Sequence, residues 1–266
     1  MDMQPRKVLP ELPASLKRII GDADLVQNKI GWSKALVFHL PERKSYLKIA
    51  LHQDYPDSLA YEAEVLKWLQ GKLPVPQVHY YQRHRDAEYL LMSEVEGLDA
   101  SREAHRRDPE GLVRLLALGL REMHSLEIGN CPFDQTLQVK IEKARSNVER
   151  GLVDENDLEP QYRGKPVQDL YALLLASLPE SQDLVFTHGD YCLPNVMIQD
   201  GKLSGFIDLG RAGVSDRYVD LALAVRSLQY NGYGAPELVE LFFQTYGLED
   251  LDQAKMEFFT LLDEFM

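Results

Sequence analysis

Five polar residues whose side chains suit phosphate chemistry occur in a fixed order along the chain. Lys48 lies inside the apolar run SYLKIAL, and Glu62 follows it 14 residues later in a segment with helical spacing. Asp190 and Asn195 lie five residues apart in HGDYCLPN, and Asp208 follows in FIDLG, at the end of a run typical of a strand. Carboxylate and amide oxygens are ligands that Mg²⁺ prefers. The order therefore predicts a site where a metal is held over a bound phosphate.

The same residue types in the same order carry out phosphoryl transfer in protein kinases. There, a strand lysine contacts the α- and β-phosphates and pairs with a helix glutamate. An aspartate lies five residues before a Mg²⁺-binding asparagine, and a later aspartate also binds Mg²⁺. The nucleophile is a hydroxyl, so a nearby carboxylate needs only to orient it and accept its proton late. The five types in this order are far more specific than any one of them, and they predict a phosphotransferase.

The catalytic segments resemble those of one family of small-molecule kinases. HGDYCLPN followed by GFIDLGRAGVSDRYVDLA resembles the aminoglycoside phosphotransferase family, whose HGDxxxxN replaces the HRDxxxxN of protein kinases. The pieces GKLPVP, LLMSE, AVRS, VELFF and LLDE resemble the 3′-phosphotransferases of that family, and together they cover nearly the whole chain. The resemblance implies ATP-dependent phosphorylation of a hydroxyl, at the 3′ position, of aminoglycoside antibiotics, which confers resistance.

The resemblance also implies the fold class and the domain organisation. We expect an α+β chain with a bilobal protein-kinase-like fold, made of a small β-rich N-lobe and a larger, mainly helical C-lobe. Residues 1–97 would form the N-lobe, with a nucleotide-binding sheet, a helix and a hinge. Residues 98–266 would form the C-lobe, with the catalytic loop, the metal site and an acidic substrate-binding region.

Individual roles follow from the resemblance by position. Asp190 would orient and deprotonate the acceptor hydroxyl. Lys48, fixed by Glu62, would contact the α- and β-phosphates of ATP. Asn195 and Asp208 would hold two Mg²⁺ ions.

Further nucleotide contacts are implied in the N-lobe. Tyr46, two residues before Lys48, matches an aromatic residue that stacks on adenine. Ser33, in a turn before the first hairpin strand, matches a serine that touches the β-phosphate. The hinge, whose backbone would read the adenine edge, contains Met92, Ser93 and Val95.

The negative charge of the chain lies entirely in its second part. Residues 1–97 carry 13 acidic and 13 basic residues, whereas residues 98–266 carry 29 acidic and 16 basic residues, so the net charge of −13 belongs to the C-lobe. Such a surface repels nucleic acid and anionic membranes, and it attracts a polycation such as an aminoglycoside. The resemblance implies a substrate-binding set made of Asp157, Glu159, Arg211, Asp263, Glu264 and the terminal carboxylate of Met266.

Some positions on the substrate side depart from the family pattern. Met266 ends the chain where close relatives often end in Phe, and Tyr230 and Pro160 stand where some relatives carry an acid. These departures leave the predicted chemistry intact and affect the range of substrates.

The apolar patterns predict the elements that position these residues. The strand-like runs at 33–40 and 45–51 predict a hairpin joined by the turn-like PERK, and the runs at 78–82 and 88–95 predict further strands. Helical spacing over 57–71 ends on Gly71, and EVEG at 94–97 is the expected linker. Four amphipathic helices are predicted beyond it, at 111–126, 167–178, 218–230 and 236–247.

The two cysteines and the hydropathy indicate in which cellular compartment the protein is expected. Cys131 and Cys192 have no metal-binding or disulfide spacing, so we expect ordinary small hydrophobic residues in a reducing cytoplasm. No apolar run is long enough to span a bilayer, and the N-terminal MDMQPRKVLPELP lacks the apolar core of a secretion signal. We expect a cytoplasmic monomer or weak dimer that binds neither nucleic acid nor membrane.

Three alternatives remain open at this point. Another small-molecule kinase of the same fold could act on choline, homoserine, a macrolide or a ketosamine, although the acid-rich C-lobe and LLDE favour aminoglycosides. A nucleotide-binding protein without activity is disfavoured because Asp190, Asn195 and Asp208 are all present. A protein kinase is disfavoured because DRYVDLALAVRS, and no A-P-E motif, follows FIDLG.

Overall fold

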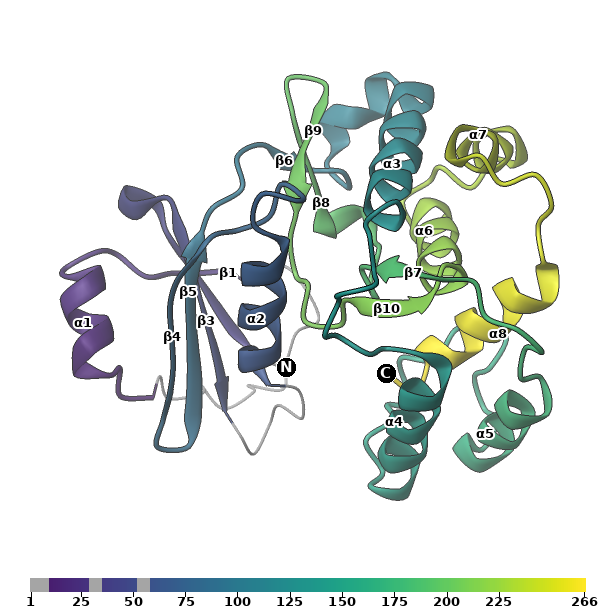
Figure 1. Ribbon diagram of the computed structural model, residues 1–266, viewed down its shortest axis with the longest axis horizontal. Helices are drawn as coiled ribbons and strands as arrows, with labels where there is room; N and C mark the ends of the chain where they lie inside the picture. The colour runs from purple at the N-terminus through teal and green to yellow at the C-terminus, as the bar shows by residue number, and fades with distance from the viewer. Residues whose placement is uncertain (1–9, 29–34, 52–57) are drawn as a thin grey trace. The chain divides into compact units, whose positions relative to one another are not determined.

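The computed structural model describes residues 10–28, 35–51 and 58–266 (Figure 1). The chain divides into two compact units, of which unit 1 comprises Met1–Gln70 and Pro76–Glu94. Unit 2 comprises Gly71–Val75 and Val95–Met266. The short segment Gly71–Val75 belongs with unit 2 because, for example, the backbone N–H of Phe206 donates to the carbonyl of Pro74 at 2.9 Å.

Unit 1 is built on a five-stranded antiparallel sheet in the order β1-β2-β3-β5-β4. The hairpin predicted around PERK is confirmed, since β2 pairs with β3 through a short 3-10 turn, and Lys44 closes it with a left-handed φ of 42°. The further strands predicted from the apolar runs are confirmed as β4 and β5. The strands are β1 Val26–Asn28, β2 Leu36–Leu40, β3 Ser45–Leu51, β4 Val78–His84 and β5 Ala87–Ser93.

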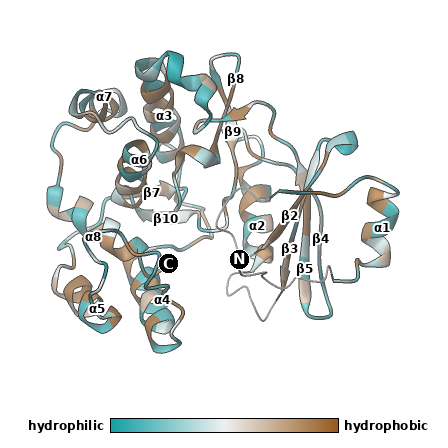
Figure 2. Ribbon diagram, turned by 180° about the vertical axis from the view of Figure 1, so that it is seen from behind, coloured by the Kyte–Doolittle hydropathy of each residue, from teal (hydrophilic) through white to brown (hydrophobic). Residues whose placement is uncertain are grey.

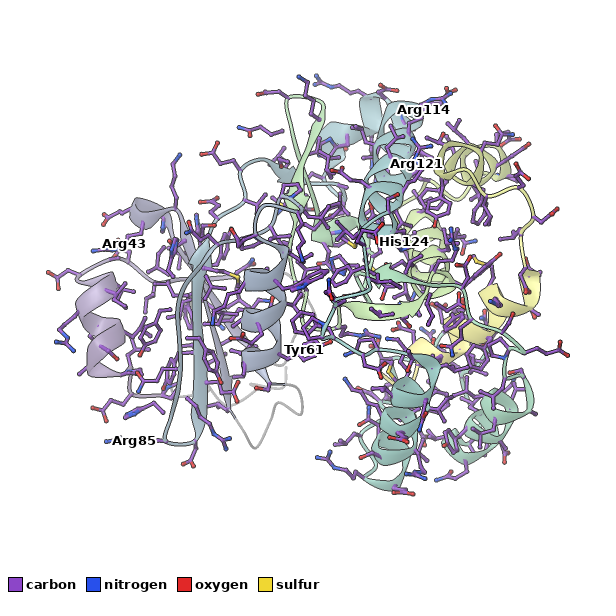
Figure 3. All side chains as sticks on the ribbon, in the orientation of Figure 1. Arg43, Tyr61, Arg85, Arg114, Arg121 and His124 are labelled. Carbon is purple, nitrogen blue, oxygen red and sulfur yellow. The ribbon has the colours of Figure 1, made fainter. Side chains whose placement is uncertain are left out.

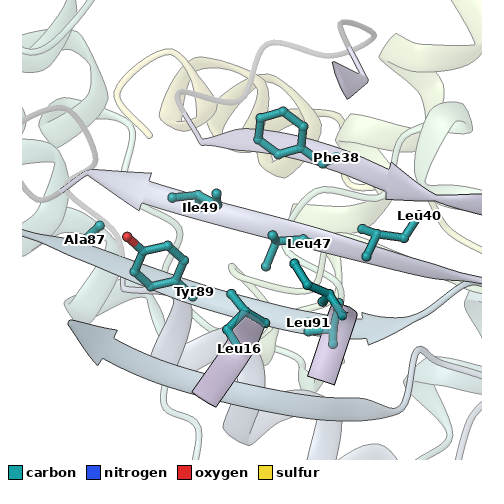
Figure 4. Close-up of a cluster of buried hydrophobic side chains, with 9 residues drawn as sticks. Leu16, Phe38, Leu40, Leu47, Ile49, Ala87, Tyr89 and Leu91 are labelled. Carbon is teal, nitrogen blue, oxygen red and sulfur yellow. The ribbon is translucent and has the colours of Figure 1, made fainter. Parts of the chain in front are cut away.

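One face of this sheet carries the hydrophobic core of unit 1. Helix α1, Ala14–Ile20, places Leu16 against Leu47 and Ile49 of β3, all with no exposed surface (Figure 4). Because side chains alternate along a strand, Tyr46 and Lys48 point to the opposite face. Removing the Leu47 side chain beyond Cβ would cost about 2–5 kcal/mol of stability.

Helix α2, Leu59–Leu69, packs against β4 and β5 of the same unit. It ends two residues before Gly71, which adopts a left-handed φ of 75°. At the start of α2, the hydroxyl of Ser58 accepts a hydrogen bond from the N–H of Ala60. The buried carboxylate of Glu88 accepts hydrogen bonds from the Ser58 hydroxyl and from the same N–H. A negative charge at a helix N-terminus is favourable, so Glu88 fixes where α2 begins.

Unit 2 is mainly helical, and its helices carry hydrophobic and hydrophilic residues along their lengths, coloured brown and teal in Figure 2. Helix α3 packs on α7, α6 packs on α8, and α4 contacts both α5 and α8. The four helices predicted from spacing are confirmed as α3, α5, α6 and α7, whereas α4 and α8 were not predicted. The bounds are α3 Pro109–His124, α4 Leu137–Glu149, α5 Val167–Ala176, α6 Tyr218–Tyr230, α7 Pro236–Tyr246 and α8 Gln253–Asp263.

Short strands in unit 2 frame the loops that carry the candidate site. A two-stranded sheet pairs β7, Leu184–Thr187, with β10, Gly213–Asp216. A three-stranded sheet has the order β6-β8-β9, with the bounds β6 Leu98–Asp99, β8 Val196–Gln199 and β9 Lys202–Phe206. The strand predicted before FIDLG is therefore confirmed as β9.

A glycine on α3 allows the segment that follows β7 to approach that helix closely. The buried hydroxyl of Tyr191 donates to the carbonyl of Leu116 at 2.8 Å. A Cβ placed on Gly119 would lie 3.2 Å from the oxygen of that hydroxyl. A larger residue at position 119 would therefore push Tyr191 away from α3.

Among the helices of the described residues, none combines the length and the hydropathy that crossing a bilayer requires.

Candidate active site

The first part of the candidate site is a buried ion pair in unit 1. Lys48 on β3 and Glu62 in the first turn of α2 are 8% and 1% exposed, and the ammonium nitrogen lies 2.6 Å from Glu62 Oε1. The pair follows from two local patterns: strand alternation turns Lys48 towards α2, and the cap at Ser58 sets the register of Glu62. Breaking a buried pair leaves an uncompensated charge, so each residue depends on the other.

Tyr46 lies on the same face of β3 as Lys48, where its ring stacks on another aromatic ring. His39, its partner in the β2–β3 register, stacks on it with ring centroids 4.6 Å apart and an interplanar angle of 19°. Nε2 of His39 lies 3.1 Å from Oε2 of Glu94. The predicted adenine-stacking residue is thus held by a neighbouring strand, a feature that the sequence did not indicate.

The predicted hinge lies at the end of β5. Met92 is opposite Tyr46 in the β3–β5 register, and Ser93 is opposite Ser45. The N–H of Ser93 donates to the carbonyl of Gln77 at 2.8 Å, and that of Glu94 donates to Lys44 at 2.8 Å. These two N–H groups are already engaged within unit 1. Val95 is the first residue of the long segment of unit 2. Ser33 lies outside the described residues.

The second part of the candidate site is the loop after β7, in unit 2. Gly189 has a φ of +79°, and a Cβ there would lie 2.1 Å from the carbonyl oxygen of Arg211, so only glycine fits between His188 and Asp190. The N–H groups of His188 and Gly189 donate to the carboxylate of Asp220 at 2.7 and 2.8 Å. Asp220, on α6, thereby fixes the backbone that carries Asp190.

Asp220 is itself held by a buried chain of side chains. His124, near the end of α3 (Figure 3), lies 3.0 Å from Asp220 through Nε2 and 2.7 Å from the hydroxyl of Tyr246 through Nδ1. Arg217 donates to the same Tyr246 hydroxyl at 3.0 Å. Burial would raise the pKa of Asp220, but its bonds to His124 and to the His188 N–H outweigh burial and lower it. Asp220 is therefore an ionised acceptor.

Asp190 and Asn195, five residues apart in the chain, are joined by hydrogen bonds. The side-chain Nδ2 of Asn195 donates to Oδ2 of Asp190 at 3.0 Å and to its main-chain carbonyl at 2.9 Å. The Asn195 amide nitrogen therefore contacts Asp190 at both its side chain and its backbone. The other carboxylate oxygen of Asp190, Oδ1, lies 3.1 Å from the thiol sulfur of Cys192.

Asp208 is brought beside this loop by the residue before it. The N–H of Ile207 donates to the carbonyl of Asn195 at 3.0 Å, and its carbonyl accepts a bond from Nε2 of His188 at 3.0 Å. Asp208 then adopts a left-handed φ of 62°. This conformation is uncommon outside glycine, although aspartate adopts it more often than most residues.

The donor chemistry around Asn195 and Asp208 fits a hard divalent cation. A carboxylate is a suitable Mg²⁺ ligand, and so is an amide oxygen whose neighbouring NH₂ group is engaged elsewhere. Mg²⁺ takes its remaining ligands from phosphate and water. Within the described part of the chain, no group of three His, Cys, Asp or Glu residues could hold a metal by itself. The residues therefore fit a metal that is bound together with a phosphate.

The third part of the candidate site is an ion-pair cluster between α6, α8 and the loop after β9. Asp263 accepts from Arg211 through Oδ1 and from Arg226 through Oδ2. Burial alone would raise the pKa of Asp263, but the two guanidinium groups outweigh burial and lower it to about 2. Both carboxylate oxygens of Asp263 are therefore engaged by arginines.

Glu159 and Glu264 border the same cluster. Glu159 Oε2 accepts from the hydroxyl of Tyr230 at 2.7 Å, and the Glu159 N–H donates to Glu264 Oε2 at 3.2 Å. Burial raises the pKa of Glu264 to about 7, despite that bond and the nearby Arg226. Burial and the charge of Glu159 raise the pKa of Tyr230 to about 12. Tyr230 is therefore a neutral donor at physiological pH.

The remaining predicted substrate residues lie apart from these contacts. Asp157 is exposed, and only its backbone N–H, which donates to Asp154, has a described hydrogen bond. The N–H of Met266 donates to the carbonyl of Asp263 at 3.0 Å, and the preceding Phe265 carbonyl accepts from Asn147 at 2.7 Å. The chain end is thus tied to α8 and α4.

Sequence reasoning missed several residues that organise the site. Arg226 occurs in AVRS, where a cation on a largely apolar helix could have indicated a buried partner. The aspartate of YVDLA could similarly have indicated a buried acceptor. Local patterns contained no comparable signal for His39, His124, Cys192 or Asn147.

Comparisons with known proteins relate this geometry to one group of enzymes. The family model described as the phosphotransferase enzyme family matches residues 24–259. An aminoglycoside 3′-phosphotransferase from Niallia circulans is 44% identical over 256 residues, covering 95% of this chain and 97% of that protein. One from Enterococcus faecalis is 35% identical and covers 98% and 99% of the two chains.

Solved structures with a similar fold belong to the same group of enzymes. The crystal structure of an aminoglycoside 3′-phosphotransferase of type VIII aligns with a TM-score of 0.86 at 31% identity, covering 95% of this chain and 97% of that one. An aminoglycoside phosphotransferase from Streptomyces rimosus, in complex with ADP and streptomycin, aligns with a TM-score of 0.82 at 29% identity, covering 94% and 95%. The expected α+β, protein-kinase-like fold class is confirmed.

Proposed function

The chain belongs to the phosphotransferase enzyme family, and from this premise we propose that it transfers the γ-phosphoryl group of ATP to a hydroxyl of an aminoglycoside antibiotic. The acceptor is the 3′-hydroxyl, and the modification confers resistance. The relatives from Niallia circulans and Enterococcus faecalis carry this activity in their names, which supports the proposal.

The observation that carries the proposal is the bonded arrangement of Asp190 and Asn195. Two donors from the Asn195 amide hold Asp190, and Ile207 joins Asn195 to the segment that ends at Asp208. An acid placed to receive a proton therefore stands beside two oxygen donors suited to a metal. This is the set of groups that transfer of a phosphoryl group to a hydroxyl requires.

The nucleotide would be bound by unit 1 and its hinge. Lys48, paired with Glu62, contacts the α- and β-phosphates, and Tyr46 stacks on the adenine. Ser33 touches the β-phosphate. The backbone at Met92, Ser93 and Val95 reads the adenine edge, through groups other than the N–H of Ser93, which already donates to Gln77.

Asp190 would orient the acceptor hydroxyl and accept its proton late in the reaction. Phosphoryl transfer passes through a loose transition state, so positioning and charge stabilisation supply most of the rate. Asp220 accepts bonds from the loop backbone, and Asn195 donates to the Asp190 carboxylate, which keeps Asp190 in place before the substrate arrives.

Asn195 and Asp208 would hold Mg²⁺ through oxygen atoms. Bound there, Mg²⁺ neutralises charge on the β- and γ-phosphates. In this proposal the Asn195 amide oxygen is available because its nitrogen is committed to Asp190.

The acidic residues of unit 2 would bind the ammonium groups of the substrate. Glu159, the Met266 carboxylate and the exposed Asp157 supply the negative charge, and Glu264, whose pKa is raised to about 7, adds to it as it ionises. Asp263 organises Arg211 and Arg226 around them. The net charge of −13 steers a polycation towards this unit.

The proposed setting is the cytoplasm, where ATP is supplied and where the two free thiols remain reduced. The chain would act there as a monomer or weak dimer.

The test is steady-state ADP release with kanamycin, neomycin, and a kanamycin-type antibiotic that lacks the 3′-hydroxyl. Turnover of the first two alone is the expected result. Turnover of all three would move the phosphorylation to another hydroxyl. Turnover of none would contradict the proposal and favour a kinase for choline, homoserine, a macrolide or a ketosamine.

A further inference from the structure

Cys192 contacts the residue to which the proposed function assigns the acceptor hydroxyl. Its sulfur lies 3.1 Å from Asp190 Oδ1, while Asn195 Nδ2 lies 3.0 Å from Oδ2. Each carboxylate oxygen therefore has a side-chain partner from the segment that follows Asp190. With both oxygens held, the carboxylate plane is fixed.

The backbone around Cys192 is fixed independently of this contact. Its N–H donates to the carbonyl of Asp190 at 2.9 Å, and its carbonyl accepts from the N–H of Asn195 at 2.9 Å. The next N–H, of Leu193, donates at 2.9 Å to the hydroxyl of Ser227, which lies on α6 and is 6% exposed. Backbone hydrogen bonds therefore hold the turn that places the thiol beside Asp190.

The thiol is the donor in this contact. Burial, together with the neighbouring charge of Asp190, raises the pKa of Cys192 well above its ordinary value. A protonated thiol has one hydrogen to donate, and an ionised carboxylate can only accept. Nucleophilic chemistry needs a thiolate in an electropositive surrounding, which is the opposite situation.

We propose that Cys192 is a positioning residue for phosphoryl transfer, which acts by donating its S–H to Asp190 and fixing the direction in which that carboxylate faces the acceptor hydroxyl. The inference rests on the proposed function, because it takes Asp190 as the group that orients the acceptor. It adds a residue to which the proposed function assigns no contact with nucleotide or metal. It also gives a role to a side chain for which the sequence predicted only packing.

Kinetics of three variants of the full chain test the effect on the reaction. Cys192→Ala removes the donor, so kcat for kanamycin should fall about tenfold, while KM for ATP and for kanamycin stays within twofold. Cys192→Ser restores a hydroxyl donor of similar reach and should recover at least a third of the original kcat. Cys131→Ser is the matched control and should leave kcat unchanged, because that sulfur contacts only the carbonyl of Phe133, at 4.0 Å, among described partners.

Infrared spectroscopy tests the bond itself without a substrate. In the Cys131→Ser background, the S–H stretch belongs to Cys192 alone, and donation to a carboxylate lowers its frequency. Changing Asp190→Ala should move the band to the higher frequency of an unbonded thiol. A loss of packing alone would not produce this shift.

Three results would overturn the inference: a band that Asp190→Ala leaves in place, full kcat in Cys192→Ala, or no recovery in Cys192→Ser. Absence of aminoglycoside turnover in the unaltered chain would count against the proposed function instead. The infrared comparison would then still decide whether the thiol holds Asp190.

Discussion

The ammonium nitrogen of Lys48 lies 2.6 Å from Oε1 of Glu62, and both side chains are almost entirely buried within unit 1. Two separate elements create this pair: β3 supplies the lysine and α2 supplies the glutamate. Glu88 and Ser58 fix the start of α2. The position of the lysine therefore depends on a helix cap as well as on its own strand.

Removing the charge of Glu62 should weaken both stability and nucleotide binding. Glu62→Gln keeps the size of the side chain but leaves the Lys48 ammonium buried without its counter-charge, which should lower the free energy of unfolding by about 3 kcal/mol. The affinity for ADP should fall about tenfold because Lys48 is no longer oriented. Urea unfolding and ADP titration measure the two effects.

An exposed pair on the same helix provides the control. Glu64 lies 2.7 Å from Lys67, with side chains 62% and 51% exposed, so Glu64→Gln should change stability by less than about 0.5 kcal/mol. Equal losses in both variants would show that burial of the Lys48 pair has no special effect.

Removing the carboxylate of Asp190 should abolish turnover and spare nucleotide binding. Asp190→Ala takes away the group that orients the acceptor and accepts its proton, so kcat should fall to below a few per cent. ADP affinity should stay within a few-fold, because the proposed nucleotide contacts lie elsewhere. Asp169→Asn, at an exposed position on α5, is the control. Substantial residual turnover in Asp190→Ala would refute the assigned role.

Local patterns predicted the elements that are most regular in sequence. The hairpin of β2 and β3 consists of two short apolar runs on either side of the turn-like PERK, and α6 repeats apolar residues over the bounds at which it was expected. The order of Lys48, Glu62, Asp190, Asn195 and Asp208 was readable because each residue lies in a short segment of recognisable type.

The remaining features depend on contacts between distant segments. Helix α4 was missed because polar residues, Lys140 and Asn147, share its buried face with Ala144. Helix α8 has a clear apolar face that includes Phe258 and Leu262, so its spacing could have indicated a helix. The Arg226–Asp263 pair joins residues 37 positions apart, and His124 meets Asp220 across 96 positions. No periodicity within one segment can indicate such a pairing, since its cause is the packing of one helix on another.

The chain of contacts that holds Asp220 should matter for both folding and catalysis. His124→Ala would leave Asp220 and the Tyr246 hydroxyl buried with one partner fewer each, at a cost of about 1–3 kcal/mol. Because Asp220 holds the N–H groups of His188 and Gly189, kcat should also fall severalfold at a temperature where the variant is folded. Urea unfolding and steady-state kinetics provide the two readings.

His79→Ala is the control for that variant, because His79 is exposed on β4. It should change neither stability nor kcat. A His124→Ala variant that is less stable but has full kcat would limit the role of His124 to folding.

The carboxyl of Glu264 should make the stability of the protein depend on pH between about 4.5 and 7. Burial raises its pKa from 4.5 to about 7, so in this window the folded state binds more protons than the unfolded state. The stability that this group contributes is fully present below pH 4.5 and is lost as the pH rises through 7.

Glu264→Gln removes the titration, so the stability of this variant relative to the unaltered chain should improve by about 1–2 kcal/mol from pH 5 to pH 8, after screening at this partly exposed site. Urea unfolding at both pH values measures the difference, with Glu257→Gln on the exposed side of α8 as the control. A stability difference between Glu264→Gln and the unaltered chain that stays constant with pH would contradict a raised pKa at Glu264.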